Sequence, residues 1–126
     1  MLRSAKKRLD SSSLVRALVI DDNAAVRAFV ERVLRDAGYE TATARDGLAA
    51  RDYVLQSGAP EVVITDQSMP RMSGHEFVHW LRQQRPDVRV LYLTGDRGTV
   101  MDDEVCLEKP CTIRALLHAV ATVVSA

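Results

Sequence analysis

The sequence predicts an α/β fold in which helices cover a central parallel sheet. Short apolar runs alternate along the chain with longer segments whose apolar residues recur every three or four positions. This alternation is typical of repeated strand–helix units. The short runs are apolar at almost every position, which indicates strands that are buried on both faces.

The first half of the chain contains three predicted strands and two predicted helices. Strands are expected over 16–21, 39–44 and 61–66, and helices over 24–37 and about 47–56. Asn23 is a good N-cap for the first helix, and Gly38 is a typical helix stop. The apolar residues of this helix follow helical spacing: Val26, Phe29, Val30, Val33, Leu34 and Ala37. The strand over 39–44 is less apolar than the others and is expected nearer a sheet edge.

The second half continues the alternation but ends with two strands in succession. A loop over 69–74 leads into a predicted helix over about 74–84, and strands are expected over 88–94 and 104–108. Thr112 can cap a last helix over 113–124. We therefore expect five parallel strands in the order 2-1-3-4-5 of a flavodoxin-like, doubly wound fold.

Composition indicates one domain with a conventional core. The chain has 126 residues, of which 47% are hydrophobic, and 17 basic residues balance 17 acidic ones. We interpret residues 1–13 as a polar, basic tail or linker and 14–126 as the domain. The neutral balance gives no case for nucleic-acid or membrane binding, and no apolar stretch approaches a membrane span or a signal peptide. Two cysteines do not make a disulfide framework, so a cytoplasmic protein is expected.

Residues suited to phosphate and metal chemistry follow four of the predicted strands. Asp21 and Asp22 follow the first strand, Asp66 ends the third, Thr94 ends the fourth, and Lys109 follows the fifth. In open α/β sheets, ligands bind outside the carboxyl ends of the strands. The sequence therefore predicts that these five side chains share one site.

Three neighbouring carboxylates favour a bound cation. Two like charges ~5 Å apart repel by about 3 kcal/mol at an effective dielectric constant of ~20. Oxygen ligands of this kind suit Mg²⁺, which leaves coordination positions for phosphate oxygens. Aspartate can form an aspartyl-phosphate, and Asp66 is the best candidate because it stands singly at the end of a central, β-branched strand. Lys109 and the Thr94 hydroxyl would then neutralise or bind the remaining phosphoryl oxygens, and the new charge would draw Thr94 and its loop toward Asp66.

The chain resembles bacterial two-component response-regulator receiver domains, of the single-domain or hybrid-kinase type, over about residues 14–126. The resemblance rests on Val19–Asn23, Asp46-Gly47, the Asp-x-x-Met-Pro-x-Met-x-Gly stretch over 66–74, Leu93–Gly95 and Glu108–Pro110. It implies that Asp66 accepts a phosphoryl group from a histidine kinase or a histidine phosphotransfer protein. It further implies Mg²⁺ (or Mn²⁺) held directly by Asp22 and Asp66, through water by Asp21, and by the backbone carbonyl of Ser68.

The same resemblance implies roles for residues around the acceptor. Thr94 and Lys109 would contact the phosphoryl group, and the Lys109–Pro110 peptide bond is typically cis. Gln67, Ser68 and Asp96 would stand beside the phosphoryl group and tune its loss. Such a domain supports only its own phosphorylation and dephosphorylation, and is not otherwise an enzyme.

Two departures from the family pattern bear on output. Only residues 95–103 connect the fourth and fifth strands, so the family's fourth helix is expected to be absent or reduced to a turn. Cys106 stands where the family usually has Tyr or Phe. We therefore expect output to an unknown downstream protein through a non-standard face, from a monomer or a weak dimer.

Weaker patterns leave alternatives open. His75 and His79 have a spacing that can bind zinc, but an exposed helix face is the simpler interpretation. Cys106 and Cys111 could have a redox or metal role, although buried small hydrophobic residues are more common. A phosphorylation-independent interaction module and an aspartate-based phosphatase remain competing functions. Such phosphatases commonly need a second acid for general acid–base chemistry, and here Asp66 is followed by Gln67-Ser68, which counts against the phosphatase.

Overall fold

A computed structural model describes residues 14–95 and 104–125. Its parallel sheet has the order β2-β1-β3-β4-β5, which confirms the predicted fold. The strands are β1 (Arg16–Ile20), β2 (Glu40–Ala44), β3 (Val62–Asp66), β4 (Arg89–Thr94) and β5 (Val105–Glu108). The described helices are α2 (Ala24–Asp36), α3 (Gly47–Ser57), α4 (Gly74–Arg82) and α5 (Ile113–Ser125). The tail over 1–13 and the expected loss of a helix over 95–103 concern segments that lie outside the described residues, except for Gly95.

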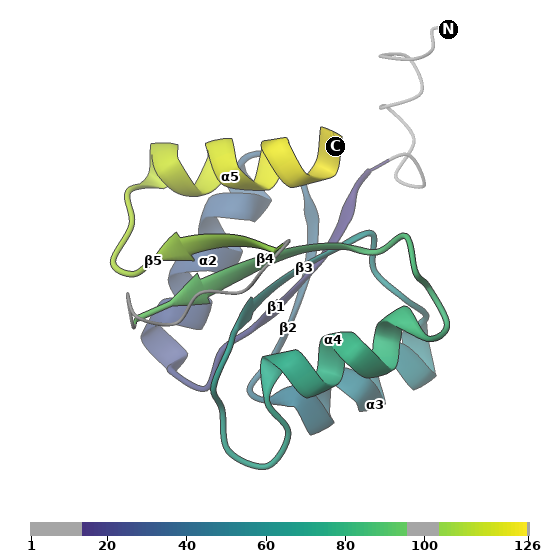
Figure 1. The fold of residues 1–126 in the computed structure, drawn as a ribbon. Helices are drawn as coiled ribbons and strands as arrows, with labels where there is room; N and C mark the ends of the chain where they lie inside the picture. The colour runs from purple at the N-terminus through teal and green to yellow at the C-terminus, as the bar shows by residue number, and fades with distance from the viewer. Residues whose placement is uncertain (1–13, 96–103, 126) are drawn as a thin grey trace, which may run out of the picture.

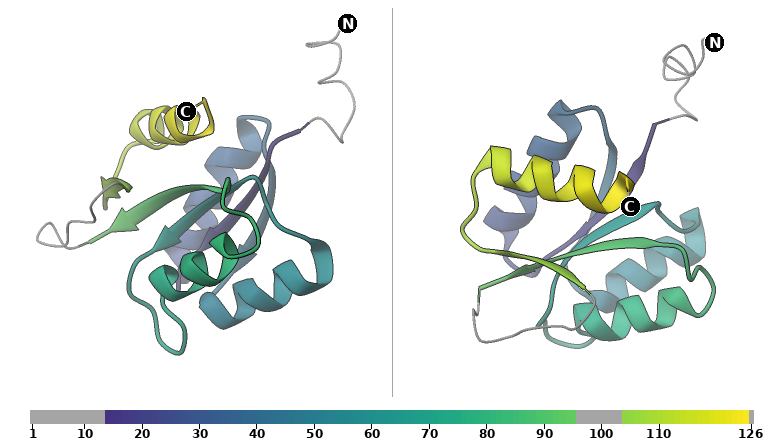
Figure 2. Two further views of the ribbon diagram at one scale, coloured as in Figure 1. Left: turned by 45° about the vertical axis from the view of Figure 1, so that its right-hand side comes forward. Right: turned by 45° about the horizontal axis from the view of Figure 1, so that its top comes forward.

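The helices form two layers around the sheet. α2 and α5 lie on one face, and α3 and α4 lie on the other (Figures 1 and 2). Each strand of the sheet interior sends alternate side chains to the two faces: Val19, Ile64 and Leu91 pack under α2 and α5, whereas Leu18 and Val63 pack under α3 and α4. The near-continuous apolar runs of the sequence therefore reflect burial on both faces.

Side-chain caps define where the helices begin. Asn23 accepts a hydrogen bond from the Val26 amide (3.0 Å), and Thr112 Oγ1 accepts one from the Ala115 amide (3.0 Å), which confirms both expected caps. Ser73 and Glu76 form a reciprocal capping box in front of α4. These contacts satisfy amide groups that a helix leaves unpaired at its first turn.

The two edges of the sheet differ from the interior. β2 is an edge strand, as its lower apolarity predicts, and β5 is the other edge. The side chains of β5 are largely exposed, including that of Cys106; the expectation that Cys106 is a buried hydrophobic residue is therefore wrong. Among the described residues, no helix has the length and apolarity needed to cross a membrane.

Candidate functional site

The parallel register brings the predicted site residues to one edge of the sheet. Ile20 pairs with Thr65 across β1 and β3, so Asp21 and Asp66 leave neighbouring strand ends together. Thr94 pairs with Glu108 across β4 and β5, and the Lys109 amide donates to the Thr94 carbonyl (2.7 Å). Four separate strand ends thus converge, as the sequence predicts.

Three carboxylates gather at this edge. One oxygen each from Asp21, Asp22 and Asp66 lies within 4.8 Å of the other two. Asp21 is buried at 1% exposure, whereas Asp22 is exposed and Asp66 is partly buried. The buried Asp21 carboxylate accepts a hydrogen bond from the Asn23 amide (2.9 Å). The donor set consists of oxygen atoms alone and remains open to solvent on one side, which fits a hard divalent cation such as Mg²⁺.

Lys109 lies between the buried carboxylate and the expected acceptor. Its Nζ is 3.0 Å from Asp21 Oδ2 and 3.7 Å from Asp66 Oδ2. Burial raises the pKa of Asp66 above its ordinary value; the Lys109 charge opposes this shift and the Asp21 charge adds to it. Asp66 therefore sits in a site whose negative charge is only partly compensated by the protein.

The loop after β3 folds back tightly on Asp66. The Gly74 amide donates to the Gln67 carbonyl (3.1 Å), and Thr65 Oγ1 donates to the Asp66 carbonyl (2.9 Å). A Cβ at Gly74 would lie 2.0 Å from the Asp66 carbonyl oxygen, so only glycine fits there. Ser68 is exposed and Gln67 is partly buried on this loop. Asp96, the remaining residue expected beside the acceptor, lies outside the described residues.

The sequence gives no sign of an ion pair that joins this loop to the start of α3. Arg71 makes a bidentate contact with Asp46, whose carboxylate also caps α3. The hydrogen bond from Arg71 holds the pKa of Asp46 below its ordinary value. The sequence contained the cap residue and the loop motif, but no periodicity connects two positions 25 residues apart.

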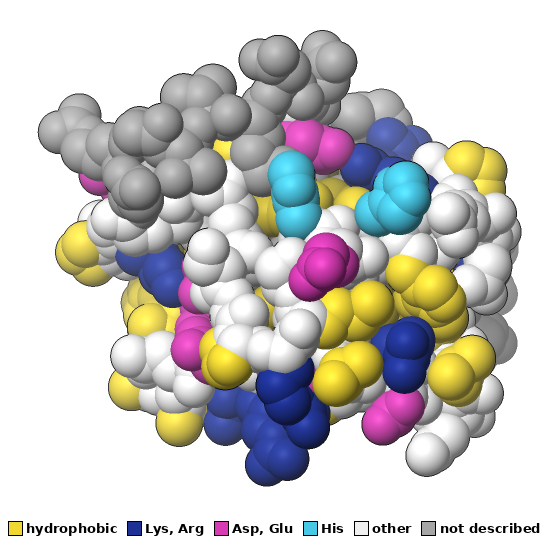
Figure 3. Space-filling model, turned by 60° about the horizontal axis from the view of Figure 1, so that its bottom comes forward, with side chains coloured by type: hydrophobic (Ala, Val, Ile, Leu, Met, Phe, Trp, Pro, Cys, Tyr) yellow, Lys and Arg dark blue, Asp and Glu magenta, His cyan; other side chains and the backbone are white. Residues whose placement is uncertain are grey.

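The residues with weaker signals do not form a second metal centre. His75 and His79 are exposed on α4, as expected, and the rings of His75 and the buried Tyr92 form a T-shaped pair with centroids 5.7 Å apart. Figure 3 shows surface histidines beside hydrophobic side chains on the α3–α4 side of the molecule. Within the described ranges, the acidic cluster is the one group of three His, Cys, Asp or Glu residues with spacing suited to a metal ion.

An apolar groove adjoins the acidic site. It has a volume of about 500 Å³ and runs between α2 and the turn after β5. Lys109 and Pro110 form one side, and Val26 and Phe29 form the other. Phe29 belongs to the apolar positions expected for this helix, yet its side chain is 39% exposed because it faces this groove.

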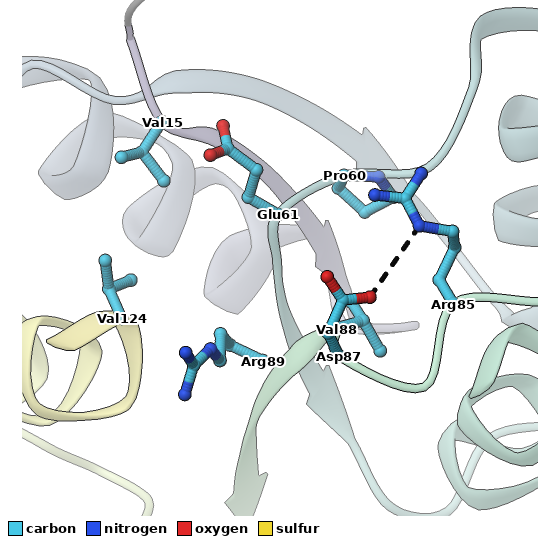
Figure 4. Close-up of a pocket in the computed structure, with 8 residues that line it drawn as sticks. All are labelled: Val15, Pro60, Glu61, Arg85, Asp87, Val88, Arg89 and Val124. Carbon is cyan, nitrogen blue, oxygen red and sulfur yellow. Dashed lines mark ion pairs between the residues drawn. The ribbon is translucent and has the colours of Figure 1, made fainter. Parts of the chain in front are cut away.

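A polar pocket lies at the opposite, amino-terminal end of the strands (Figure 4). Arg85 and Asp87 form an ion pair there at 3.7 Å, and Glu61 and Arg89 also line it. Most of its residues precede β1, β3 or β4 or begin β4, and Val124 is near the end of α5, so the pocket is separated from Asp66 by the length of the sheet.

The chain belongs to the receiver domains of response regulators. The sequence model described as "Response regulator receiver domain" matches residues 17–121. The chemotaxis protein CheY4 of Vibrio cholerae has the same fold with a TM-score of 0.79 and 31% identity, covering 88% of this chain and 99% of that one.

Curated relatives place similar domains in larger proteins. The chain is 40% identical to response regulator MprA of a Mycobacterium species over 81 residues, which are 64% of this chain and 35% of that protein. It is 31% identical to sensor histidine kinase RcsC of Salmonella typhi over 127 residues, which are 95% of this chain and 13% of that protein. A protein-glutamate methylesterase/protein-glutamine glutaminase of Anaeromyxobacter dehalogenans is 45% identical over 57% of this chain and only 20% of its own length. The chain thus spans a minor part of these relatives.

Proposed function

We propose that this domain receives a phosphoryl group on Asp66 from a phosphohistidine of a histidine kinase or a histidine phosphotransfer protein. The observation that carries the proposal is the position of Lys109, whose Nζ lies within 3.7 Å of the Asp66 carboxylate beside two further carboxylates. A structural ion pair needs only one lysine and one carboxylate. A cluster with excess negative charge is better suited to a cation and a phosphoryl group.

In the proposed reaction, a carboxylate oxygen of Asp66 forms a bond to phosphorus while the bond from phosphorus to the histidine nitrogen breaks. Asp66 must be ionised to attack, and Lys109 favours that ionised form. The Lys109 ammonium and the Thr94 hydroxyl would bind equatorial oxygens, which carry charge in the transition state. Thr94 is only 7% exposed, so its proposed shift toward the phosphoryl group would move its loop as well.

We propose that Asp22, Asp66 and the Ser68 backbone carbonyl hold Mg²⁺ (or Mn²⁺), with Asp21 acting through water. The bound cation would neutralise charge on a phosphoryl oxygen. Asp21 has a separate role within the protein, because its buried carboxylate fixes the position of Lys109. Gln67 and Ser68, on the loop beside Asp66, and Asp96 are the residues proposed to tune phosphoryl lifetime.

The apolar groove beside Lys109 is the proposed contact for the phosphodonor protein. A donor histidine must approach Asp66 from the carboxyl edge of the sheet, and the groove lies at that edge between α2 and Pro110. An exposed aromatic side chain such as Phe29 can supply much of the binding energy in such an interface. The proposed setting is the cytoplasm, which agrees with the two free cysteines.

Output is proposed to occur by protein contact through a face that differs from that of most receivers, with the domain acting as a monomer or weak dimer. Cys106 provides a small exposed side chain where the family resemblance implies an aromatic switch residue. The structural change that follows phosphorylation would therefore have to reach the output surface through Thr94 and its loop, without that aromatic group.

Phosphoramidate provides a direct test because its phosphorus–nitrogen bond resembles that of phosphohistidine. We expect wild type with phosphoramidate and Mg²⁺ to gain the mass of one phosphoryl group, which hydroxylamine then removes. Asp66→Asn should gain none, and excess EDTA should abolish the gain in wild type. An unmodified wild type would reject the phosphoacceptor role and favour an interaction module that does not depend on phosphorylation.

A further inference from the structure

An ion pair outside the acidic cluster connects the loop after β3 to the loop before α3. Arg71 Nε donates to Asp46 Oδ2 (2.8 Å), and Arg71 Nη2 donates to Oδ1 (3.1 Å). Asp46 is 4% exposed, and its Oδ1 also accepts from the Ala49 amide (2.8 Å). Bidentate contact with a buried carboxylate fixes direction as well as distance.

The backbone of Arg71 is in a conformation that arginine rarely adopts. Its φ is 71°, and it is the one non-glycine residue with positive φ among the described ranges. Left-handed backbone costs most residues on the order of 1 kcal/mol, and glycine is the usual residue at such positions. The Asp46 contact therefore provides a reason for an arginine here, since its side chain holds the strained turn in place.

The strained turn belongs to the segment that carries Ser68 and Gln67. Beside Asp66, Gly74 packs against the Asp66 backbone, and the Gly74 amide donates to the Gln67 carbonyl. Farther from Asp66, at the start of α3, the Gly47 amide donates to the Met72 carbonyl (2.9 Å). A Cβ at Gly47 would lie 2.5 Å from that same carbonyl oxygen, so the two loops are in close contact. Residues 67–73 are thus held in two places, beside Asp66 and where they contact the start of α3. The Arg71–Asp46 ion pair strengthens the second contact.

We propose that Arg71 and Asp46 are positioning residues for the phosphoacceptor site. Their ion pair fixes the backbone of residues 67–73, and through it the Ser68 carbonyl that is proposed as a metal ligand. Neither residue is a proposed ligand or a contact of the acceptor. This inference rests on the proposed function, because it assigns the pair a purpose in metal binding and phosphorylation.

Two single variants separate positioning from stability. Arg71→Gly removes the ion pair but also relieves the strained φ, so its thermal midpoint should remain close to that of wild type. Asp46→Asn removes the charge but retains a side chain that caps helices well. Arg71→Ala, which loses the ion pair and keeps the strain, should be less stable than Arg71→Gly. Arg85→Ala is the matched control, since it removes an arginine from the ion pair with Asp87 at the other end of the sheet.

The primary readout is Mg²⁺ affinity, measured by amide NMR shifts during titration without any phosphodonor. We expect Arg71→Gly and Asp46→Asn each to weaken Mg²⁺ binding by about 10-fold, the lower range for residues that orient metal ligands. Hydrogen exchange of the Gly47 amide should accelerate in both variants. The double variant should be no worse than either single variant, and Arg85→Ala should match wild type. Phosphorylation by acetyl phosphate should slow in parallel with the loss of Mg²⁺ affinity.

Mg²⁺ affinity equal to that of wild type in both single variants would overturn the inference, even if exchange at Gly47 accelerates. Additive losses in the double variant would also overturn it, because independent effects do not describe one ion pair. A wild type that binds Mg²⁺ but is never phosphorylated would reject the proposed function alone, and the Mg²⁺ titrations would still decide the role of Arg71. A wild type that binds no Mg²⁺ would reject both.

Discussion

Lys109 lies closer to Asp21 than to Asp66: its Nζ is 3.0 Å from Asp21 Oδ2 and 3.7 Å from Asp66 Oδ2. The buried Asp21 carboxylate therefore holds the Lys109 ammonium beside Asp66, which is the proposed acceptor. At 3.7 Å the contact with Asp66 is longer than a hydrogen bond, which suits the proposed role of Asp66 as the phosphoacceptor. This arrangement also makes Lys109 important to two carboxylates that differ in burial.

Replacing Lys109 should change both the rate and the pH dependence of phosphorylation. In Lys109→Gln, Asp66 loses the charge that lowers its pKa, so the carboxyl group remains protonated to a higher pH. We expect a rate reduction of about 100-fold or more, typical of a lost group that stabilises transition-state charge, and a rate–pH profile displaced to higher pH. The measurement is the initial rate with acetyl phosphate and Mg²⁺ across pH 4 to 8. An unshifted profile would contradict the proposed link between Lys109 and Asp66.

Removing the charge of Asp66 should stabilise the fold in the absence of a divalent cation. The pKa of Asp66 is raised in the folded protein, so the folded state binds more protons than the unfolded state between the two pKa values. The free energy of unfolding therefore falls as pH rises through that window, and it stays lowered at neutral pH. Asp66→Asn should show a higher thermal midpoint than wild type at pH 7 in EDTA, and Mg²⁺ should raise the midpoint of wild type more than that of the variant. A lower midpoint for the variant in EDTA would refute this account of the acidic cluster.

Gly74 should tolerate no side chain. In Gly74→Ala, the Cβ would lie 2.0 Å from the Asp66 carbonyl oxygen and 2.7 Å from Thr65 Oγ1. We expect a loss of about 2–3 kcal/mol in the free energy of unfolding, the upper part of the range for overpacked sites, measured by urea denaturation. Gly95→Ala is the control, because nothing lies within 4 Å of a Cβ there and its effect should stay within about 0.5 kcal/mol. Equal stability of both variants would show that the β3–α4 loop has room to move away from Asp66.

The groove beside α2 should matter for protein donors and not for small ones. Phe29→Ser should slow phosphotransfer from the fastest histidine kinase in a panel by about 10-fold, the effect of one interface residue worth about 1.4 kcal/mol. Its rate with acetyl phosphate should be unchanged. Leu55→Ser, which alters an exposed apolar residue on α3, is the matched control and should behave as wild type with both donors. Equal slowing by the two variants would place the donor contact elsewhere.

The fold and the members of the acidic site were predictable because their signals are local. Each strand and helix of the sequence interpretation lies within about two residues of its observed bounds, since apolar period and cap residues determine these elements directly. The convergence of Asp21, Asp66 and Lys109 was predictable because the carboxyl ends of the strands in an open α/β sheet form its ligand-binding edge. The Lys109–Pro110 bond is cis, as the family resemblance implied.

Contacts between loops were not predictable in the same way. The partnership of Arg71 with Asp46 depends on how two loops approach each other, and the sequence identifies Asp46 only as part of an Asp-Gly motif next to a predicted helix. The exposure of Phe29 and Cys106 depends on what covers α2 and β5, which sequence period does not determine. Tertiary packing determines these features. The proposals on donor docking and on the positioning of the Ser68 carbonyl depend on them.

The identity of the modified residue tests most directly whether Asp66 is the phosphoacceptor. Wild type would be incubated with acetyl phosphate and Mg²⁺, reduced with borohydride and digested, and its peptides sequenced by mass spectrometry. Reduction converts an aspartyl-phosphate to homoserine, so we expect homoserine at position 66 and unmodified aspartate at positions 21 and 22. A modification at another residue, or none at all after incubation with acetyl phosphate, would contradict the assignment of Asp66 as the acceptor.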